Sequence, residues 1–326
     1  MAETQARHPR REAGSLLAPG HEARVLEPSP PANEDPAWFA DDPTDPSDAA
    51  VAVTPIPGEG ATWAQLAQAD DAVAAYAHDH WLDGVRPLVA FAAGFQATRD
   101  SLHQVAFFVL APARYTATGK LGLRYTHRGF GTPFSRKEPG QDEQVRVEGG
   151  LLVHQVGETA RVTNLTTLAA AASFLDLEYE EEWFDSFHDP LDPIGPTAPL
   201  EVDPAAADVL GGWFGFATHV LERLRRAEAE DISRVQLWPE HFDAAIEAGS
   251  SQAGQRASYG ASPGDASHPE PYLFVTPWDT VDESDPYWNA PGFVGAILGH
   301  AELVEADDPY STAIDFYLTG LNVLTR

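Results

Sequence analysis

Cysteine is absent from this 326-residue chain, which also has a single methionine and only two lysines, Lys120 and Lys137. Without cysteine, the protein has no disulfides, thiolate zinc sites, iron–sulfur clusters or cysteine nucleophiles. Any metal ion must therefore be bound by histidine, aspartate or glutamate side chains.

Basic charge is also scarce, because 20 Lys and Arg residues stand against 50 Asp and Glu residues and give a net charge of −30. A field of that sign repels phosphate, so we expect no binding to nucleic acid or membranes. No apolar run approaches the roughly 18 residues needed to cross a bilayer. The charged N-terminus lacks the apolar core of a signal peptide. The sequence therefore predicts a cytoplasmic protein.

Large apolar side chains are few in residues 1–58, which are rich in proline and acidic residues. Such a segment cannot bury enough apolar surface to offset the entropy lost on ordering. We expect a disordered, acidic, proline-rich arm at 1–58, followed by a single folded domain at 59–326. The proline-rich stretch 186–203 is where a sub-boundary within that domain would fall.

The remaining sequence shows both helical and strand periodicity. Helices are predicted at 62–82, 166–177, and from the Asp-Pro pairs at 203–204 and 308–309. Strands are predicted at 120–126, 234–247, 255–259 and 271–276, with a hairpin at 143–155 around Gly149 and Gly150. Residues 100–111 fit a buried strand or a short helix, and residues 128–134 fit a turn. Strands and helices come in blocks, which predicts an α+β fold with antiparallel sheets packed against helices.

Aromatic, proline and polar residues are most concentrated between residues 236 and 278. Aromatic side chains with a few polar groups are typical of pocket walls, so we expect this region to bind a small ligand or a protein partner. Arg128, which precedes a glycine turn, is expected to contact an anionic part of the ligand. The predicted ligand-binding residues are Trp238, Tyr259, Asp265, Tyr272, Trp278 and Arg128.

The same region supports an alternative function, a metal-dependent hydrolase. Strand alternation places His241 and Asp243 on one face, and His268 and Glu270 would approach them from a loop. Such nitrogen and oxygen ligands suit a divalent metal such as Zn, Mn or Fe. Glu240 or Glu270 would then be the base that activates water. No established spacing such as H-E-x-x-H is present, and a solvated polar face is the competing interpretation.

A third function is that of an interaction scaffold, in which the acidic arm at 1–58 recruits a basic protein partner. The chain contains neither G-x-G-x-x-G nor a Walker loop, so its motifs give no support to nucleotide binding.

The chain contains the three short motifs LWPEHFD at 237–243, YGASPGD at 259–265 and HPEPY at 268–272. They resemble motifs of a family of actinobacterial proteins of unknown function. The resemblance spans residues 98–278. It implies one continuous folded unit and assigns no catalytic residue.

Overall fold

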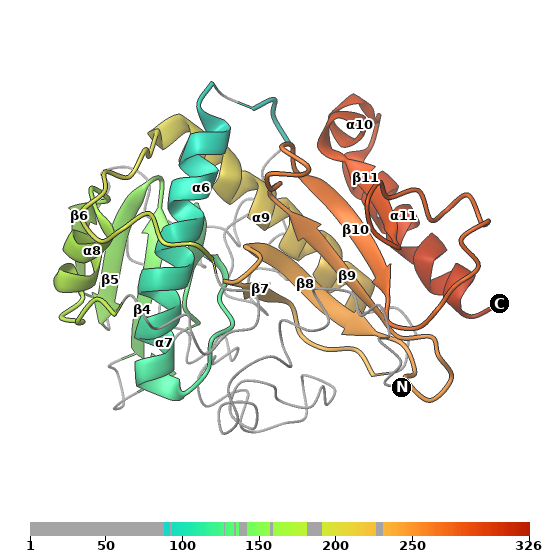
Figure 1. The fold of residues 1–326 in the computed structure, drawn as a ribbon, viewed down its shortest axis with the longest axis horizontal. Helices are drawn as coiled ribbons and strands as arrows, with labels where there is room; N and C mark the ends of the chain where they lie inside the picture. The colour runs from blue at the N-terminus through green and yellow to red at the C-terminus, as the bar shows by residue number, and fades with distance from the viewer. Residues whose placement is uncertain are drawn as a thin grey trace, which may run out of the picture.

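A computed structural model describes most of the chain beyond the N-terminal quarter. The described residues are 88–91, 93–126, 128–133, 135–136, 142–156, 159–180, 191–225 and 231–326. The arm expected at 1–58 and the helix expected at 62–82 lie outside them. Helices pack against two antiparallel sheets (Figure 1), and this arrangement confirms the predicted α+β class.

One long helical stretch lies in front of the first sheet in Figure 1. It consists of α6 (Phe95–Val105), the π-helical turn η1 (Ala106–Leu110) and α7 (Ala111–Thr118). The wide turn accommodates Pro112, which has no N–H to offer an α-helical bond. The N–H of Ala111 instead bonds to the carbonyl of Ala106, five residues earlier. Of the two structures predicted for residues 100–111, the buried helix is the one that forms.

The first sheet is a meander with strand order β1-β2-β4-β5-β6, and β3 pairs with β4. Its strands are β1 (Arg124–Thr126), β2 (Gly129–Gly131), β3 (Ser135–Arg136), β4 (Asp142–Glu148), β5 (Leu151–Val156) and β6 (Thr159–Asn164). The β4–β5 hairpin turns at Gly149 and Gly150, whose φ angles are 55° and 84°, so the predicted hairpin is confirmed.

The predicted turn at 128–134 is wrong for its centre, where β2 pairs with both β1 and β4. A side chain at Gly129 or Gly131 would collide with backbone carbonyls of β4. Glycine at both positions therefore permits the close approach of two strands.

The second sheet is also a meander, with strand order β11-β10-β9-β8-β7. Its strands are β7 (Gln236–Trp238), β8 (Asp243–Ala248), β9 (Ala257–Ser262), β10 (Tyr272–Pro277) and β11 (Ala296–Gly299). The single strand predicted at 234–247 is wrong, since a tight turn divides it into β7 and β8. At the end of that turn Phe242 has a φ of 55°, which no extended strand allows.

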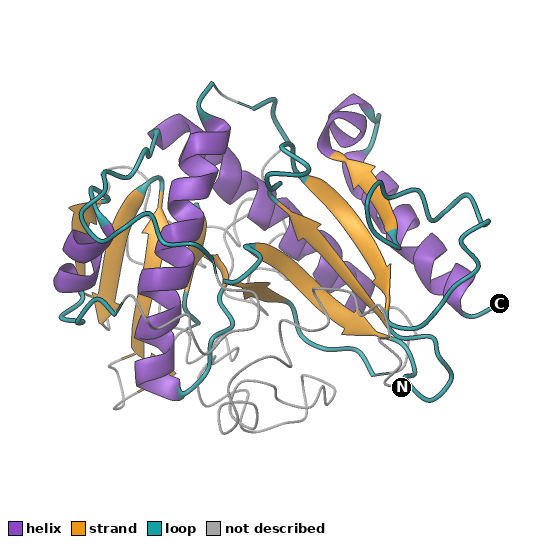
Figure 2. Ribbon diagram, viewed as in Figure 1, coloured by secondary structure: helices purple, strands orange, loops and turns teal. Residues whose placement is uncertain are grey.

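Helix α9 (Pro204–Arg225) packs against both sheets, as the view coloured by secondary structure shows (Figure 2). Three aromatic rings meet between α9 and the two sheets. They belong to Phe130 of β2, Phe214 of α9 and Phe242 directly before β8, and their centroids lie 4.9–5.9 Å apart. Leu123 and Leu237 exchange backbone hydrogen bonds of 2.8 Å between the sheet edges. One hydrophobic cluster therefore includes residues of both sheets.

The remaining helices described are α8 (Leu168–Phe174), which packs against α6 and η1, and α10 (His300–Glu305) and α11 (Pro309–Leu324), which pack against the second sheet. The Asp-Pro starts predicted for two helices are confirmed. Asp203 accepts a hydrogen bond of 2.9 Å from the N–H of Ala206 in α9. Asp308 likewise accepts from the N–H of Ser311 in α11, at 3.1 Å. These caps satisfy amides that have no partner within the helix.

The proline-rich segment before α9 lies against α6. The side chain of Gln104 donates to the carbonyl of Asp192 at 2.8 Å, and the N–H of Glu201 donates to Ser101 Oγ at 2.9 Å. Residues 191–203 are therefore attached to the helical layer along their length.

Adjacent glycines in α9 are expected to respond oppositely to alanine. In Gly211→Ala the new Cβ would lie 2.6 Å from the backbone carbonyl of Arg128, which should lower the free energy of unfolding by about 1–3 kcal/mol. In Gly212→Ala the Cβ has no atom of the described residues within 4 Å beyond the surrounding helix backbone, and better helix propensity should raise that free energy by about 0.5–1 kcal/mol. Urea unfolding of both variants measures the difference, and effects of the same sign would contradict this packing.

Candidate ligand-binding site

The region 236–278 contains strands β7 to β10 of the second sheet, and its aromatic side chains are largely used in packing. Tyr259 and Tyr272 lie in separate clusters on opposite faces of that sheet. Tyr259 packs against Tyr317 of α11, and burial raises the pKa of its phenol. Tyr272 packs in a smaller cluster with Trp238. These predicted ligand-binding residues do not share one cavity wall.

Two other predicted ligand-binding residues hold loops of the second sheet in place. Asp265 accepts hydrogen bonds from the N–H groups of Ser267 and His268, at 2.6 and 2.8 Å. Trp278 donates from Nε1 to Ser258 Oγ at 3.2 Å. Both contacts stabilise local backbone or neighbouring strands.

Arg128 lies between β1 and β2 and has a φ of 53°. Its Nε and Nη2 atoms lie 2.9 and 2.8 Å from Oδ1 of Asp208 in α9. The guanidinium group predicted to meet an anionic ligand thus binds a carboxylate of the protein itself.

The four predicted metal ligands do not come together. His241 lies in the turn before β8, and Asp243 begins β8 with 2% of its surface exposed. His268 and Glu270 lie in the loop before β10, and β9 separates β8 from β10. Across the described residues, no three histidine or carboxylate side chains are placed to hold one metal ion. Of the two candidate bases, Glu240 is buried in the β7–β8 turn and Glu270 is exposed.

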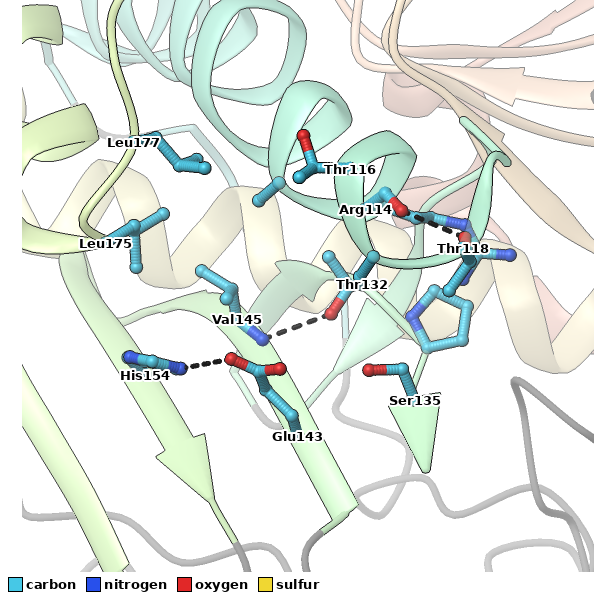
Figure 3. A pocket seen from close by; sticks show the side chains of 13 residues that line it. Arg114, Thr116, Thr118, Thr132, Ser135, Glu143, Val145, His154, Leu175 and Leu177 are labelled. Carbon is cyan, nitrogen blue, oxygen red and sulfur yellow. Dashed lines mark hydrogen bonds and ion pairs between the residues drawn. The ribbon is translucent and has the colours of Figure 1, made fainter. Parts of the chain in front are cut away.

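A different pocket lies between α7 and the first sheet, and we call it the α7 pocket (Figure 3). Its volume is about 260 Å³. Side chains from α7, from β3 and the residues before it, from β4 and β5, and from the segment after α8 line it. Its hydroxyl groups belong to Thr116, Thr118, Thr132 and Ser135. Its apolar wall includes Val145, Leu175 and Leu177.

A hydrogen-bonded acid–imidazole pair occupies one side of this pocket. His154 Nε2 lies 2.6 Å from Glu143 Oε1, and Arg161 Nη2 lies 2.8 Å from His154 Nδ1. A guanidinium group has only donors, so Nδ1 accepts and Nε2 carries the imidazole proton. His154 therefore donates to the carboxylate of Glu143, and neither residue is more than 18% exposed.

Strand register explains why these side chains meet. Ser135 of β3 pairs directly with Glu143 of β4, and Val145 of β4 pairs with His154 of β5. Paired residues of antiparallel strands project to the same face, so the serine, the carboxylate and the imidazole share one face. Figure 3 shows His154 on one side of Glu143 and the hydroxyl of Ser135 on the other.

Arg114 and Thr118 close the opposite end of the α7 pocket (Figure 3). Thr118 Oγ1 donates to the carbonyl of Arg114 at 2.9 Å, and Arg114 is 2% exposed. Thr132 Oγ1 accepts from the N–H of Val145 at 3.1 Å. The pocket thus has a carboxylate at one end, a buried cation at the other and hydroxyl groups between them.

Part of this site can be predicted from the register of one hairpin. A two-residue turn at 149–150 pairs residue 148 with 151, and hence 145 with 154. Glu143 and His154 then fall on one face as diagonal neighbours.

No protein family, curated protein or solved structure matches this chain. The resemblance to actinobacterial proteins therefore stays a prediction. Among the helices of the described residues, none is long and apolar enough to cross a membrane.

Proposed function

We propose that the protein binds a small polar molecule in the α7 pocket, and that the molecule donates hydrogen bonds through an amine or hydroxyl group. The observation that carries this proposal is the 2.6 Å hydrogen bond from His154 to Glu143 inside a cavity. It retains the small-ligand function expected from the sequence and moves the site from the second sheet to the first.

The chemistry of Glu143 favours a ligand with donor groups. An ionised carboxylate only accepts hydrogen bonds, and its two oxygens offer about four acceptor positions. His154 donates to Oε1 of this carboxylate, and a ligand in the pocket would donate to another of its acceptor positions. The hydroxyl of Ser135, opposite Glu143 in the strand register, adds a group that both donates and accepts.

The size of the α7 pocket limits the ligand to a small molecule. Its volume of about 260 Å³ corresponds to roughly nine water-sized units of about 30 Å³ each. Val145, Leu175 and Leu177 supply apolar contact for a short carbon chain. A small amine or polyol fits this combination of a few polar groups and an apolar wall.

Ethanolamine and glycerol test this function, with acetate as a probe of similar size that offers no donor at neutral pH. We expect ethanolamine to shift the side-chain nitrogen resonances of His154 in a saturable way. Glu143→Gln should weaken ethanolamine binding about 10-fold or more, because a hydrogen bond to a charged group contributes about 1.5–3 kcal/mol.

Glu180→Gln is the matched control, since Glu180 is exposed and lies outside the pocket lining. Equal losses in the two variants would mean that net charge, rather than the pocket, governs binding. Acetate binding as tight as that of ethanolamine, or no response of His154 to either donor, would refute the proposal.

A further inference from the structure

A second cavity, also of about 260 Å³, lies between the segment before α6, helix α9 and the start of α10. We call it the α9 cavity. Leu88, Val209, Gly212, Trp213 and His300 are among the residues that line it. Among the described residues, it shares no lining residue with the α7 pocket.

His300 brings a polar group into this largely apolar cavity. The residue is 4% exposed, and its ring centroid lies 4.0 Å from that of Phe91 and 5.7 Å from that of Trp213. Among the described residues no hydrogen bond or ion pair reaches its imidazole. Its ring nitrogens are not among the fully enclosed unpaired atoms of the described residues, so they remain accessible to a ligand or water in the cavity.

Burial lowers the pKa of His300 to about 4, so its ring is neutral at pH 7. A neutral imidazole offers one donor nitrogen and one acceptor nitrogen, and it does not attract anions. Asp208 also lines the cavity, but its carboxylate is held by Arg128 at 2.8 Å. These two observations favour an uncharged ligand.

Gly212 provides the space that a ring requires. Outside the surrounding backbone of α9, no heavy atom of the described residues lies within 4 Å of the position where its Cβ would be. The cavity next to Gly212 is lined by the apolar side chains of Leu88 and Val209 and by the indole of Trp213. An engineered cavity of about 150 Å³ lined by apolar side chains binds benzene, so the α9 cavity has room for a substituted ring.

We infer that the α9 cavity binds a small, uncharged, single-ring aromatic molecule that carries a hydroxyl group. The ring packs among the aromatic and aliphatic side chains, where aromatic pairs gain stability beyond their buried area. The hydroxyl group hydrogen-bonds to the imidazole of His300. This site is independent of the function proposed for the α7 pocket.

Phenol is the probe, and toluene and cyclohexanol are its controls, since toluene lacks the hydroxyl group and cyclohexanol lacks the aromatic ring. Nitrogen resonances of His300 report binding in the full-length protein. We expect phenol to shift them in a saturable way and to bind at least 10-fold more tightly than either control.

Three variants distinguish this site from nonspecific association. Gly212→Leu fills the cavity and should abolish the phenol-induced shift, whereas Gly212→Ala leaves most of the space and should keep it. His300→Phe retains an aromatic ring without a hydrogen-bonding atom. In that variant phenol and toluene should differ less than threefold in affinity, measured by calorimetry.

Several results would overturn the inference. One is that phenol causes no saturable shift of the His300 resonances in the unaltered protein. Another is that phenol binds Gly212→Leu as tightly as it binds the unaltered protein. Cyclohexanol binding as tight as phenol binding would rule out the aromatic class. If Gly212→Leu fails to fold, the His300 resonances of the unaltered protein still decide the outcome.

Discussion

Replacing Glu148 with alanine is expected to lower the free energy of unfolding by about 3–5 kcal/mol, because the change leaves a buried cation without its carboxylate. Arg146 and Glu148 are both completely buried, and the Nε and Nη2 atoms of Arg146 each lie 2.9 Å from Glu148 Oε2. Arg146 Nη1 also donates to Gln155 Oε1 at 2.8 Å. Burial lowers the pKa of Arg146, and Glu148 opposes that shift.

Chemical denaturation of Glu148→Ala measures this effect, and Arg146→Met combined with Glu148→Leu provides the informative comparison. Removing both charges avoids an unpaired buried ion, so the double variant should be clearly more stable than Glu148→Ala. A loss below about 1 kcal/mol for Glu148→Ala would mean that water reaches this guanidinium group, as it does for exposed ion pairs.

The parts of the fold that follow from sequence depend on chemistry within a few residues. Gly149 and Gly150 permit the positive φ angles of a tight hairpin turn, and they occupy that turn in the structure. The Asp-Pro pairs at 203–204 and 308–309 similarly begin α9 and α11. Each of these signals is readable because no distant residue is needed to complete it.

The wrong predictions concern segments whose backbone conformation is determined by contacts with residues far away in the sequence. The interruption between β7 and β8 is held by His103, whose Nε2 lies 3.0 and 3.1 Å from the carbonyl oxygens of Pro239 and Glu240. These contacts join residues more than 130 positions apart. Alternation along 234–247 carries no sign of them, so it predicts one continuous strand.

The candidate sites show the same division between local and distant information. The pairing of Glu143 with His154 follows from one hairpin and is accessible from the sequence. The position of α7 over that hairpin cannot be predicted from the sequence, because it depends on packing between the helical layer and the sheet. The aromatic residues at 236–278 are apolar, so their presence in the sequence fits a hydrophobic core as well as a pocket wall. The structure uses most of them in the core.

Acid should destabilise the protein through His103 well before most carboxylates titrate. Its ring stacks on Phe242 with centroids 5.1 Å apart, and desolvation lowers its pKa from 6.5 to about 4. The unfolded chain binds a proton near pH 6.5, whereas the folded protein binds one only near pH 4. Stability contributed by neutral His103 is therefore complete above pH 6.5 and is lost as the pH falls toward 4. The expected loss is about 3 kcal/mol by pH 4, since a pKa difference of about 2.5 at about 1.4 kcal/mol per unit sets an upper limit of about 3–4 kcal/mol.

His103→Gln isolates this contribution, because the amide nitrogen of glutamine can still donate to the carbonyls of Pro239 and Glu240 but does not titrate. At pH 7.5 the variant should unfold at a urea concentration close to that of the unaltered protein. Between pH 6.5 and pH 4.5 it should lose about 2 kcal/mol less, since one proton fewer is taken up on unfolding. Parallel pH profiles for the two proteins would show that the contact between α6 and the β7–β8 turn does not depend on a neutral imidazole.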